Sequence, residues 1–304
     1  MLKDRILFTL KFFDLQNTPL TISQLRDFLL NEPALLKAAA GSSFEISAPV
    51  VLPNPVSEKE IQQALLELSL EVEEQRGFYC LRDRTEIITQ QVENASYRLK
   101  RERLVRKFVP NLRFVPFVRG VGVGGSQTLG HPKKESDIDL LIILDNKFFW
   151  LGRLLVTGYF QMTTRRRHGR FIANRFCLNH YLAGPIELSD ERDPYNAMEY
   201  LRLRPEVYGH NITEFVRRNE SWIRQFFPQA HILAGEKQNQ SRLQRGLEKL
   251  FRNFFGRKLN TWLGRWQMRR IRRGEPAVAT ETELSFHSKQ RKFDFLAKFF
   301  QDQQ

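Results

Sequence analysis

Cysteine is scarce in this 304-residue chain, and long apolar runs are missing. The two cysteines, Cys80 and Cys177, lie far apart, which excludes a disulfide scaffold and is typical of a reducing compartment. The nearest approach to a membrane span, residues 148–160, is interrupted by Arg153, whereas a span needs ~18–20 apolar residues. Residues 1–5 alternate in charge, which is not typical of a signal peptide. We therefore expect a cytoplasmic protein with no transmembrane segment.

Acidic residues are also in the minority: 34 Asp and Glu stand against 48 Lys and Arg, for a formal net charge of +14. Hydrophobic residues at 41% and charged residues at 27% exclude a chain that is disordered throughout. The net charge is −5 over residues 1–94, +11 over 95–170, −1 over 171–240 and +9 over 241–304. The two basic blocks predict a polyanionic partner, since excess positive charge attracts polyanions.

The pattern of breaks divides the chain into four parts. We predict a winged-helix-like domain over 1–94, a basic linker helix over 95–110, a catalytic domain over 111–192 and a helical C-terminal region over 193–304. The linker helix has two interpretations, a solvated connector or one wall of a phosphate-binding cleft.

The N-terminal part combines helical patterns with one hairpin. Capping boxes begin two of the helices, at Thr21 with Gln24 and at Ser57 with Glu60. Residues 72–81 predict a hairpin that turns at Arg76-Gly77. The third helix and its hairpin are acidic, so duplex DNA would repel the face with which a winged helix reads DNA. A docking, packing or dimerising role is therefore favoured over DNA reading.

Residues 114–144 carry the clearest chemical pattern. A short buried strand ends in Gly124-Gly125-Ser126, and after a polar loop Asp137 and Asp139 begin a strongly apolar strand. Side chains two apart on a strand point the same way, so the two carboxylates project together. Such a pair ionises together only beside cations, and hard oxygen ligands favour Mg²⁺. The glycines let a backbone approach phosphate closely, which predicts a metal–nucleotide site.

These five residues give the chain a resemblance to the DNA polymerase β-like nucleotidyltransferase superfamily. The overall layout of the chain is similar to that of bacterial nucleotidyltransferase-domain proteins with a helical C-terminal part. The resemblance implies an α/β (α+β) fold, with a nucleotidyltransferase-type mixed sheet and flanking helices over roughly residues 110–190. It also implies that the glycine turn at 124–126 holds the phosphates of an NTP. Asp137 and Asp139 would bind Mg²⁺, and an acid on a later strand would assist the attacking hydroxyl.

The later strand departs from the family pattern. Asn179 occupies the expected position of the third carboxylate, and asparagine can ligate a metal but cannot accept a proton. Glu187 is a possible substitute, and His180 should point to the opposite face. Two interpretations stay open. The protein is an Mg²⁺-dependent enzyme that transfers a nucleoside monophosphate from an NTP to an acceptor hydroxyl, or it is a catalytically degenerate regulator that binds nucleotide or nucleic acid.

A basic turn at residues 165–170 precedes that strand. Clustered charges on a turn are commonly solvated, yet the planar guanidinium groups of Arg165 and Arg167 are suited to gripping a triphosphate or an acceptor. The acceptor itself, whether nucleic acid, protein or small molecule, is not predicted by the sequence.

The C-terminal region has two features of interest. Asn219 and Trp222 are candidates for holding the nucleobase, although ordinary core positions fit better. Residues 243–266 form one amphipathic helical pattern, and arginines extend the basic run to residue 273. The segment 243–273 could pack on the domain, bind nucleic acid, or lie on an anionic membrane at the inner face. Residues 275–283 predict a loop, and 284–304 a final helix.

Overall fold

A central sheet of six strands organises the computed structural model, which describes residues 2–39, 50–129, 133–188, 190, 192–273, 278–286 and 289–301. The strand order is β6-β3-β4-β5-β8-β7. Strand β4 runs parallel to β5, and every other neighbouring pair is antiparallel. The strands are β3 (Val118–Gly124), β4 (Ile138–Leu144), β5 (Phe176–Ala183), β6 (Arg204–Val207), β7 (Val278–Ala279) and β8 (Glu283–Ser285).

Helices cover both faces of this sheet, so β4 is apolar on both sides. Leu140, Ile142 and Leu144 pack into a core with helices α6, α8 and α13. Leu141 and Ile143 point the other way, into a core with α9, α10 and α11. The helices of the first face are α6 (Ala95–Phe108), α8 (Phe149–Met162), α12 (Arg242–Phe251) and α13 (Phe254–Arg272). Those of the second are α9 (Pro194–Leu201), α10 (Gly209–Arg218) and α11 (Glu220–Phe226). Short connectors are η1 (Val109–Phe114), α7 (Ser126–Leu129) and η2 (Asn146–Phe148).

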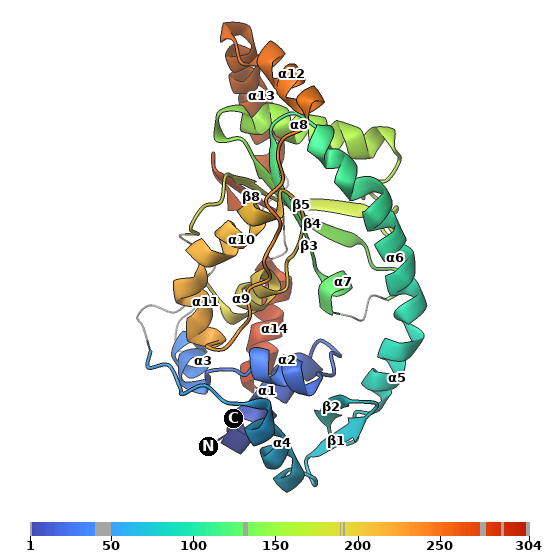
Figure 1. Ribbon diagram of the computed structural model, residues 1–304, viewed down its shortest axis with the longest axis vertical. Helices are drawn as coiled ribbons and strands as arrows, with labels where there is room; N and C mark the ends of the chain where they lie inside the picture. Colours follow the sequence, from blue (N-terminus) through green and yellow to red (C-terminus); the bar gives the residue numbers. More distant parts are fainter. Residues whose placement is uncertain are drawn as a thin grey trace.

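The N-terminal part packs below the sheet, as Figure 1 shows. Both predicted capping boxes are present, and the predicted hairpin turns at Arg76 and Gly77, which have positive φ. The winged-helix interpretation stays a prediction. The elements are α1 (Leu2–Asp14), α2 (Ile22–Asp27), α3 (Glu32–Ala39), α4 (Glu58–Glu67), β1 (Val72–Gln75), β2 (Phe78–Leu81) and α5 (Glu86–Glu93).

The first and last described helices are neighbours. Helix α14 (Lys289–Gln301) places Phe299 against Phe8 and Phe12 of α1, with ring centroids 4.9 and 5.2 Å apart. The two ends of the chain therefore lie side by side in Figure 1. A single buried cluster joins the N-terminal helices, helices α9–α11 and α14. The N-terminal part thus shares its core with the C-terminal region.

Two predictions for the C-terminal region are wrong in detail. The pattern over 243–266 is not one helix, because α12 ends at Phe251 and Asn253 caps α13 by accepting a hydrogen bond from the Gly256 N–H. Part of the loop predicted over 275–283 forms the edge strand β7, which pairs with β8, and β8 pairs in turn with β5. Strand β6 was not predicted. It includes Pro205, which has no N–H to donate, and an edge strand tolerates proline because one side of the strand needs no hydrogen-bond partner. Within the described ranges, no helix is both long and apolar enough to cross a membrane.

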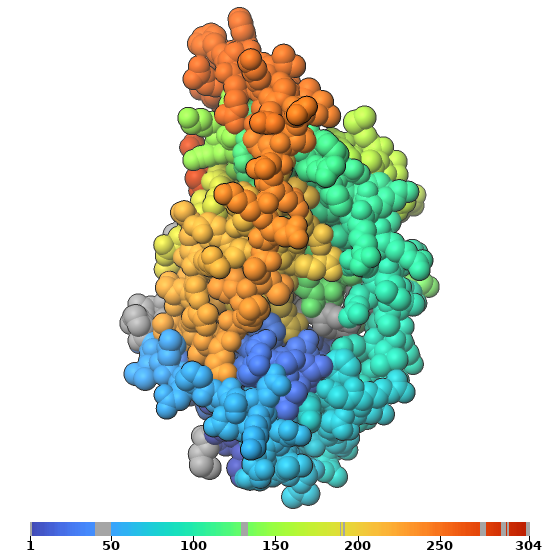
Figure 2. All heavy atoms as spheres, in the orientation of Figure 1, coloured from blue at the N-terminus to red at the C-terminus, as the bar shows by residue number. Residues whose placement is uncertain are grey.

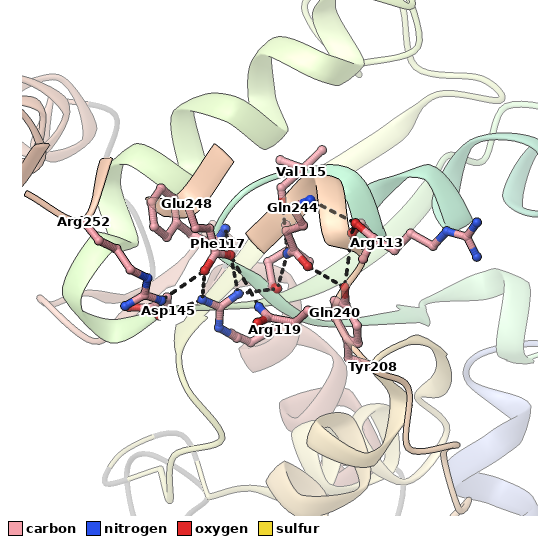
Figure 3. Close-up of polar contacts among 12 residues, drawn as sticks. Arg113, Val115, Phe117, Arg119, Asp145, Tyr208, Gln240, Gln244, Glu248 and Arg252 are labelled. Carbon is pink, nitrogen blue, oxygen red and sulfur yellow. Dashed lines mark hydrogen bonds and ion pairs between the residues drawn. The ribbon is translucent and has the colours of Figure 1, made fainter. Parts of the chain in front are cut away.

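A polar cluster ties α12 to the sheet (Figure 3). Buried Glu248 accepts two hydrogen bonds from Arg119 of β3 and one from the Phe117 N–H, all at 2.8 Å. Asp145, just after β4, accepts from Arg119 and from Arg252, each at 2.8 Å. These guanidinium groups hold the pKa values of both carboxyl groups below their usual range. The cluster fixes α12 through charge pairs that are shielded from water.

We predict that Glu248→Ala lowers the free energy of unfolding by about 3 kcal/mol, because it removes a buried carboxylate that accepts from Arg119, Arg252 and the Phe117 N–H and leaves Arg119 with Asp145 as its remaining charged partner. Glu214→Ala, which breaks an exposed pair with Arg218, is the matched control and should cost less than about 1 kcal/mol. Urea denaturation measures both. Equal losses for the two variants would contradict the proposed anchoring of α12.

Candidate active site

The glycine turn and the aspartate strand touch each other. Gly124, the last residue of β3, is the register partner of Asp139 on β4. Gly125 follows with φ of +66°, in the left-handed region. A Cβ at Gly125 would lie 2.9 Å from Cγ of Asp139 and nearer still to its Oδ2. Only glycine satisfies both the backbone conformation and the space, so the turn is shaped around the carboxylate.

Two carboxylates and a thiol converge at this edge of the sheet. The ligand atoms of Asp137, Asp139 and Cys177 all lie within 4.8 Å of one another. Asp139 and Cys177 are partners on the parallel strands β4 and β5. Arg167, from the basic turn, donates to Oδ2 of Asp137 at 2.6 Å and to Sγ of Cys177 at 3.3 Å. The structure thus brings Arg167 to the aspartate pair.

The surroundings of Asp139 oppose its negative charge. Burial, the charge of Asp137 and the charge of Glu199 raise the pKa of Asp139 to about 7. Asn179, which donates from Nδ2 to Oδ1 of Asp139 at 3.0 Å, and Arg167 counter this in part. Burial also raises the pKa of the Cys177 thiol. Asp139 is therefore a carboxyl group whose ionised form needs a further cation.

The donor set fits Mg²⁺ through its oxygens. Mg²⁺ binds through one or two carboxylates and keeps other positions for water and substrate phosphates. Asp137 and Asp139 supply two such groups with too little positive charge around them. Cys177 does not fit as a ligand, because a thiol held protonated is neither hard nor charged.

Arg101 on α6 holds the loop that leads into Asp137. Its side chain is fully buried. Nε donates to the Ser136 carbonyl at 3.1 Å, and Nη2 donates to the carbonyls of Lys133, Lys134 and Ser136 at 2.5, 3.1 and 2.9 Å. One guanidinium therefore holds three backbone carbonyls of the loop ahead of the aspartates. In the sequence, Arg101 is one of several basic residues of the linker helix, and no pattern distinguishes it from the others.

Other predicted residues lie elsewhere. Glu187 is exposed and pairs with Arg192 at 3.1 Å. It follows the end of β5 opposite to Cys177, about six strand residues or ~20 Å away, so the structure does not bring it to the aspartates. Arg165 lies over the ring of Phe108 at 5.3 Å. Ser126 begins the four-residue helix α7 next to the turn.

The two residues considered for base recognition are core residues. Asn219 is fully buried and donates from Nδ2 to the carbonyls of Ile186 and Phe215. Its Oδ1 accepts from the Leu188 N–H and from Nε1 of Trp222. With these hydrogen bonds made inside the protein, both side chains serve the scaffold.

Sequence reasoning missed Glu199 and Arg202, both contributed by the segment around α9. Glu199 is half-buried and lies close enough to Asp139 for its charge to raise that pKa. Arg202 is buried between Phe13 and Phe28, with its guanidinium 4.9 and 4.5 Å from their ring centroids. None of its three nitrogens has a hydrogen-bond partner among the described residues, and burial lowers its pKa to about 10. No motif marks either residue, because only the fold places α9 beneath the glycine turn.

Two cavities lie at the other end of the sheet. One of about 600 Å³ is lined by residues that include Arg119, Tyr208 and Arg245, and one of about 350 Å³ by residues that include Asp145, Lys147 and Arg252. Arg119 is near the start of β3 and Asp145 follows β4, whereas Gly124 and Asp139 are at the opposite ends of these strands. Neither cavity contains a residue of the glycine–aspartate site.

A family comparison covers the same part of the chain. Residues 103–174 match the family model described as "Nucleotidyltransferase domain". The match includes the glycine turn, both aspartates and Arg167, and it ends before Asn179. Comparisons with curated proteins and with solved structures gave no match. The match shows a nucleotidyltransferase domain over residues 103–174, and this match, the mixed sheet and the abutting turn and aspartates are consistent with the DNA polymerase β-like superfamily.

Proposed function

We propose that the protein is a Mg²⁺-dependent enzyme that transfers a nucleoside monophosphate from an NTP to an acceptor hydroxyl. The observation that carries this proposal is the abutment of Gly125 and Asp139. It puts a backbone with no Cβ directly beside the carboxylate of Asp139, whose neighbour Asp137 is half-buried. A triphosphate at the turn would lie within reach of a metal held by Asp137 and Asp139.

Each part of the site has a distinct role in this proposal. The backbone at Gly124, Gly125 and Ser126 receives the β- and γ-phosphates, and Asp137 and Asp139 hold the metal. When bound, Mg²⁺ would neutralise the phosphates and orient the α-phosphate for attack. The acceptor oxygen forms a new bond to the α-phosphorus, the bond to the bridging oxygen of the β-phosphate breaks, and pyrophosphate leaves.

Arg167 is the side chain that supplies positive charge next to Asp137. Its guanidinium pairs with Asp137, yet its side chain is 43% exposed and belongs to a turn that reaches outward. A metal on Asp137 would compete with this pair for the carboxylate. We propose that Arg167 then turns to the triphosphate, where a planar guanidinium binds phosphate oxygens well.

The proton of the acceptor hydroxyl needs a base other than Asn179. Asn179 is committed as a donor to Asp139 and accepts no proton. Glu199 is the further carboxylate whose charge reaches Asp139, so we assign it the role of the third acid. The same asparagine supports a second candidate function, a regulator that binds nucleotide or nucleic acid without turning NTP over.

We predict that the wild-type protein transfers radiolabel from an α-labelled NTP in the presence of Mg²⁺ and that Asp137→Ala with Asp139→Ala abolishes the transfer. Glu199→Gln should lower the rate by about 10²–10⁴-fold, the usual contribution of a general base. Glu214→Gln, on the exposed face of α10, is the control and should retain the wild-type rate.

The outcomes separate the alternatives. If Glu187→Gln, and not Glu199→Gln, lowered the transfer rate, the general base would be Glu187, the substitute that the sequence suggests. NTP binding without transfer in the wild-type protein would favour the regulator.

Gly125→Ala should reduce the transfer rate by about 100-fold, because the new methyl displaces the Asp139 carboxylate and small misplacements at a reacting centre are costly. Gly77→Ala provides a matched control: Gly77 also has positive φ, at +79°, but nothing lies within 4 Å of its added Cβ. Both variants carry backbone strain of about 1 kcal/mol, measurable by thermal unfolding. An equal rate loss in both variants would refute the role of the close approach at Gly125.

Metal binding should strengthen as the pH rises through about 7. In the metal-free folded protein Asp139 keeps its proton up to about pH 7, whereas in the unfolded chain it releases the proton near pH 4. Asp139 therefore lowers the free energy of unfolding as the pH rises from about 4 to 7. A bound cation favours the ionised form, and its affinity should fall up to tenfold for each pH unit below 7. Calorimetric titration with Mn²⁺ at pH 6 and pH 8 tests this, with Asp139→Asn as the control that should lose the dependence. Identical affinity of the wild-type protein at both values would contradict it.

A further inference from the structure

Helices α12 and α13 form the pole of the molecule opposite to the N-terminal part (Figures 1 and 2). One face of α13 is anchored to α8. Gly264 packs against the indole of Trp150, and Gln267 donates to the Trp150 carbonyl at 2.9 Å and accepts from Arg153 at 2.5 Å. Helix α12 is held by Glu248 and Gln244. These contacts fix which face of the pair is left to solvent.

The solvent-exposed side of α13 is apolar, whereas the exposed side of a surface helix in a soluble protein is usually polar. Phe255, Leu259, Trp262 and Trp266 recur at intervals of three and four residues along α13, so they form one stripe. Their exposed fractions are 77%, 39%, 61% and 47%. Three more exposed apolar residues belong to the same pair of helices: Leu243 and Leu250 on α12, and Phe254 at the start of α13. Of the three interpretations of this segment, packing on the domain does not account for the stripe.

Basic residues flank the stripe. Residues 242–273 contain 11 Lys and Arg and a single acidic residue, Glu248, which is buried and already paired. Lys258 and Arg265 are next to stripe residues in the sequence, and Arg269 and Arg270 lie one helical turn beyond Trp266. Nucleic acid would pair with the cations and stack on the aromatic rings, but it would leave the exposed leucines Leu243, Leu250 and Leu259 in water. An anionic bilayer binds both kinds of side chain, because the apolar side chains enter the boundary of the acyl chains and the basic side chains contact the anionic head groups.

We propose that the α12–α13 face, residues 242–273, is an interfacial anchor that docks the protein on the surface of a bilayer containing anionic lipid. The α12–α13 pair lies at the end of the molecule opposite to the N-terminal part, so a bilayer that meets this end stays clear of the N-terminal part (Figures 1 and 2). The glycine–aspartate site is remote from this face, because it lies at the end of the sheet opposite to the cluster that anchors α12. Docking therefore leaves the turn and the aspartates open to NTP.

Vesicle flotation tests the anchor. The full-length protein should float with vesicles of phosphatidylcholine and phosphatidylglycerol at low salt, and should not float with phosphatidylcholine alone. Flotation should weaken at 1 M salt, where charges are screened beyond about 3 Å. Tryptophan emission should shift to the blue on binding, because Trp262 and Trp266 are exposed whereas Trp150 and Trp222 are buried. Absence of flotation with anionic vesicles, or equal flotation with neutral ones, would overturn the proposal.

Paired variants locate the surface. Phe255→Glu with Trp262→Glu should lower the partition coefficient at least about tenfold, whereas Leu66→Glu with Leu70→Glu, at equally exposed apolar positions, should leave it unchanged. Arg269→Glu with Arg270→Glu should lower it about fivefold for each basic residue lost, against Lys100→Glu with Arg103→Glu on α6 as the control of equal charge. Circular dichroism verifies that each variant is folded.

Two outcomes of the variant series would overturn the assignment. One is unchanged flotation of the Phe255 and Trp262 variant. The other is a wild-type protein that does not float but binds single-stranded RNA, with the RNA binding lost in this variant. That result would indicate that the α12–α13 face binds nucleic acid.

Discussion

The carboxylate of Asp139 fills the space that a side chain at position 125 would need, and this contact constrains the whole edge of the sheet around the glycine turn. It requires a left-handed glycine at the end of β3, the register that pairs Gly124 with Asp139, and a loop held firmly enough to deliver the strand in that register. Arg101 supplies the last requirement from a helix that precedes the sheet in sequence. The result is a carboxyl group that is buried, crowded by like charge and short of cations. Such an arrangement is costly for a fold alone, which is why it points to a ligand.

Local signals predicted the local structure well. The two capping boxes, the Arg76-Gly77 hairpin and the Asp193 cap with Pro194 are formed by residues within ten positions of one another, so a short stretch of sequence contains all the partners. The glycine turn and the Asp-x-Asp strand were predicted for the same reason. Their mutual contact followed from the family resemblance, because no spacing rule fixes the register between two strands that a polar loop separates.

Contacts between distant segments could not be predicted in this way. Strand β8 joins β5 across about a hundred residues, and β6 is built around a proline that reads as a helix terminator. Arg101, Glu199 and Glu248 look like ordinary charged positions of surface helices until the fold buries them or brings them to a carboxylate. Arg202 is the extreme case, since its position between two phenylalanines of the N-terminal part depends on the packing of both halves of the chain.

The pairing of α1 with α14 bears on how the chain is made. Phe8 and Phe12 of α1 meet partners nearly 290 residues downstream, which a ribosome adds at about 5–20 residues per second. For roughly 15–60 s the nascent N-terminal part must keep an aromatic face uncovered, whatever its own helices have already formed. Newly made protein is therefore most exposed to chaperones, and to aggregation, at the surface that the finished protein hides most completely.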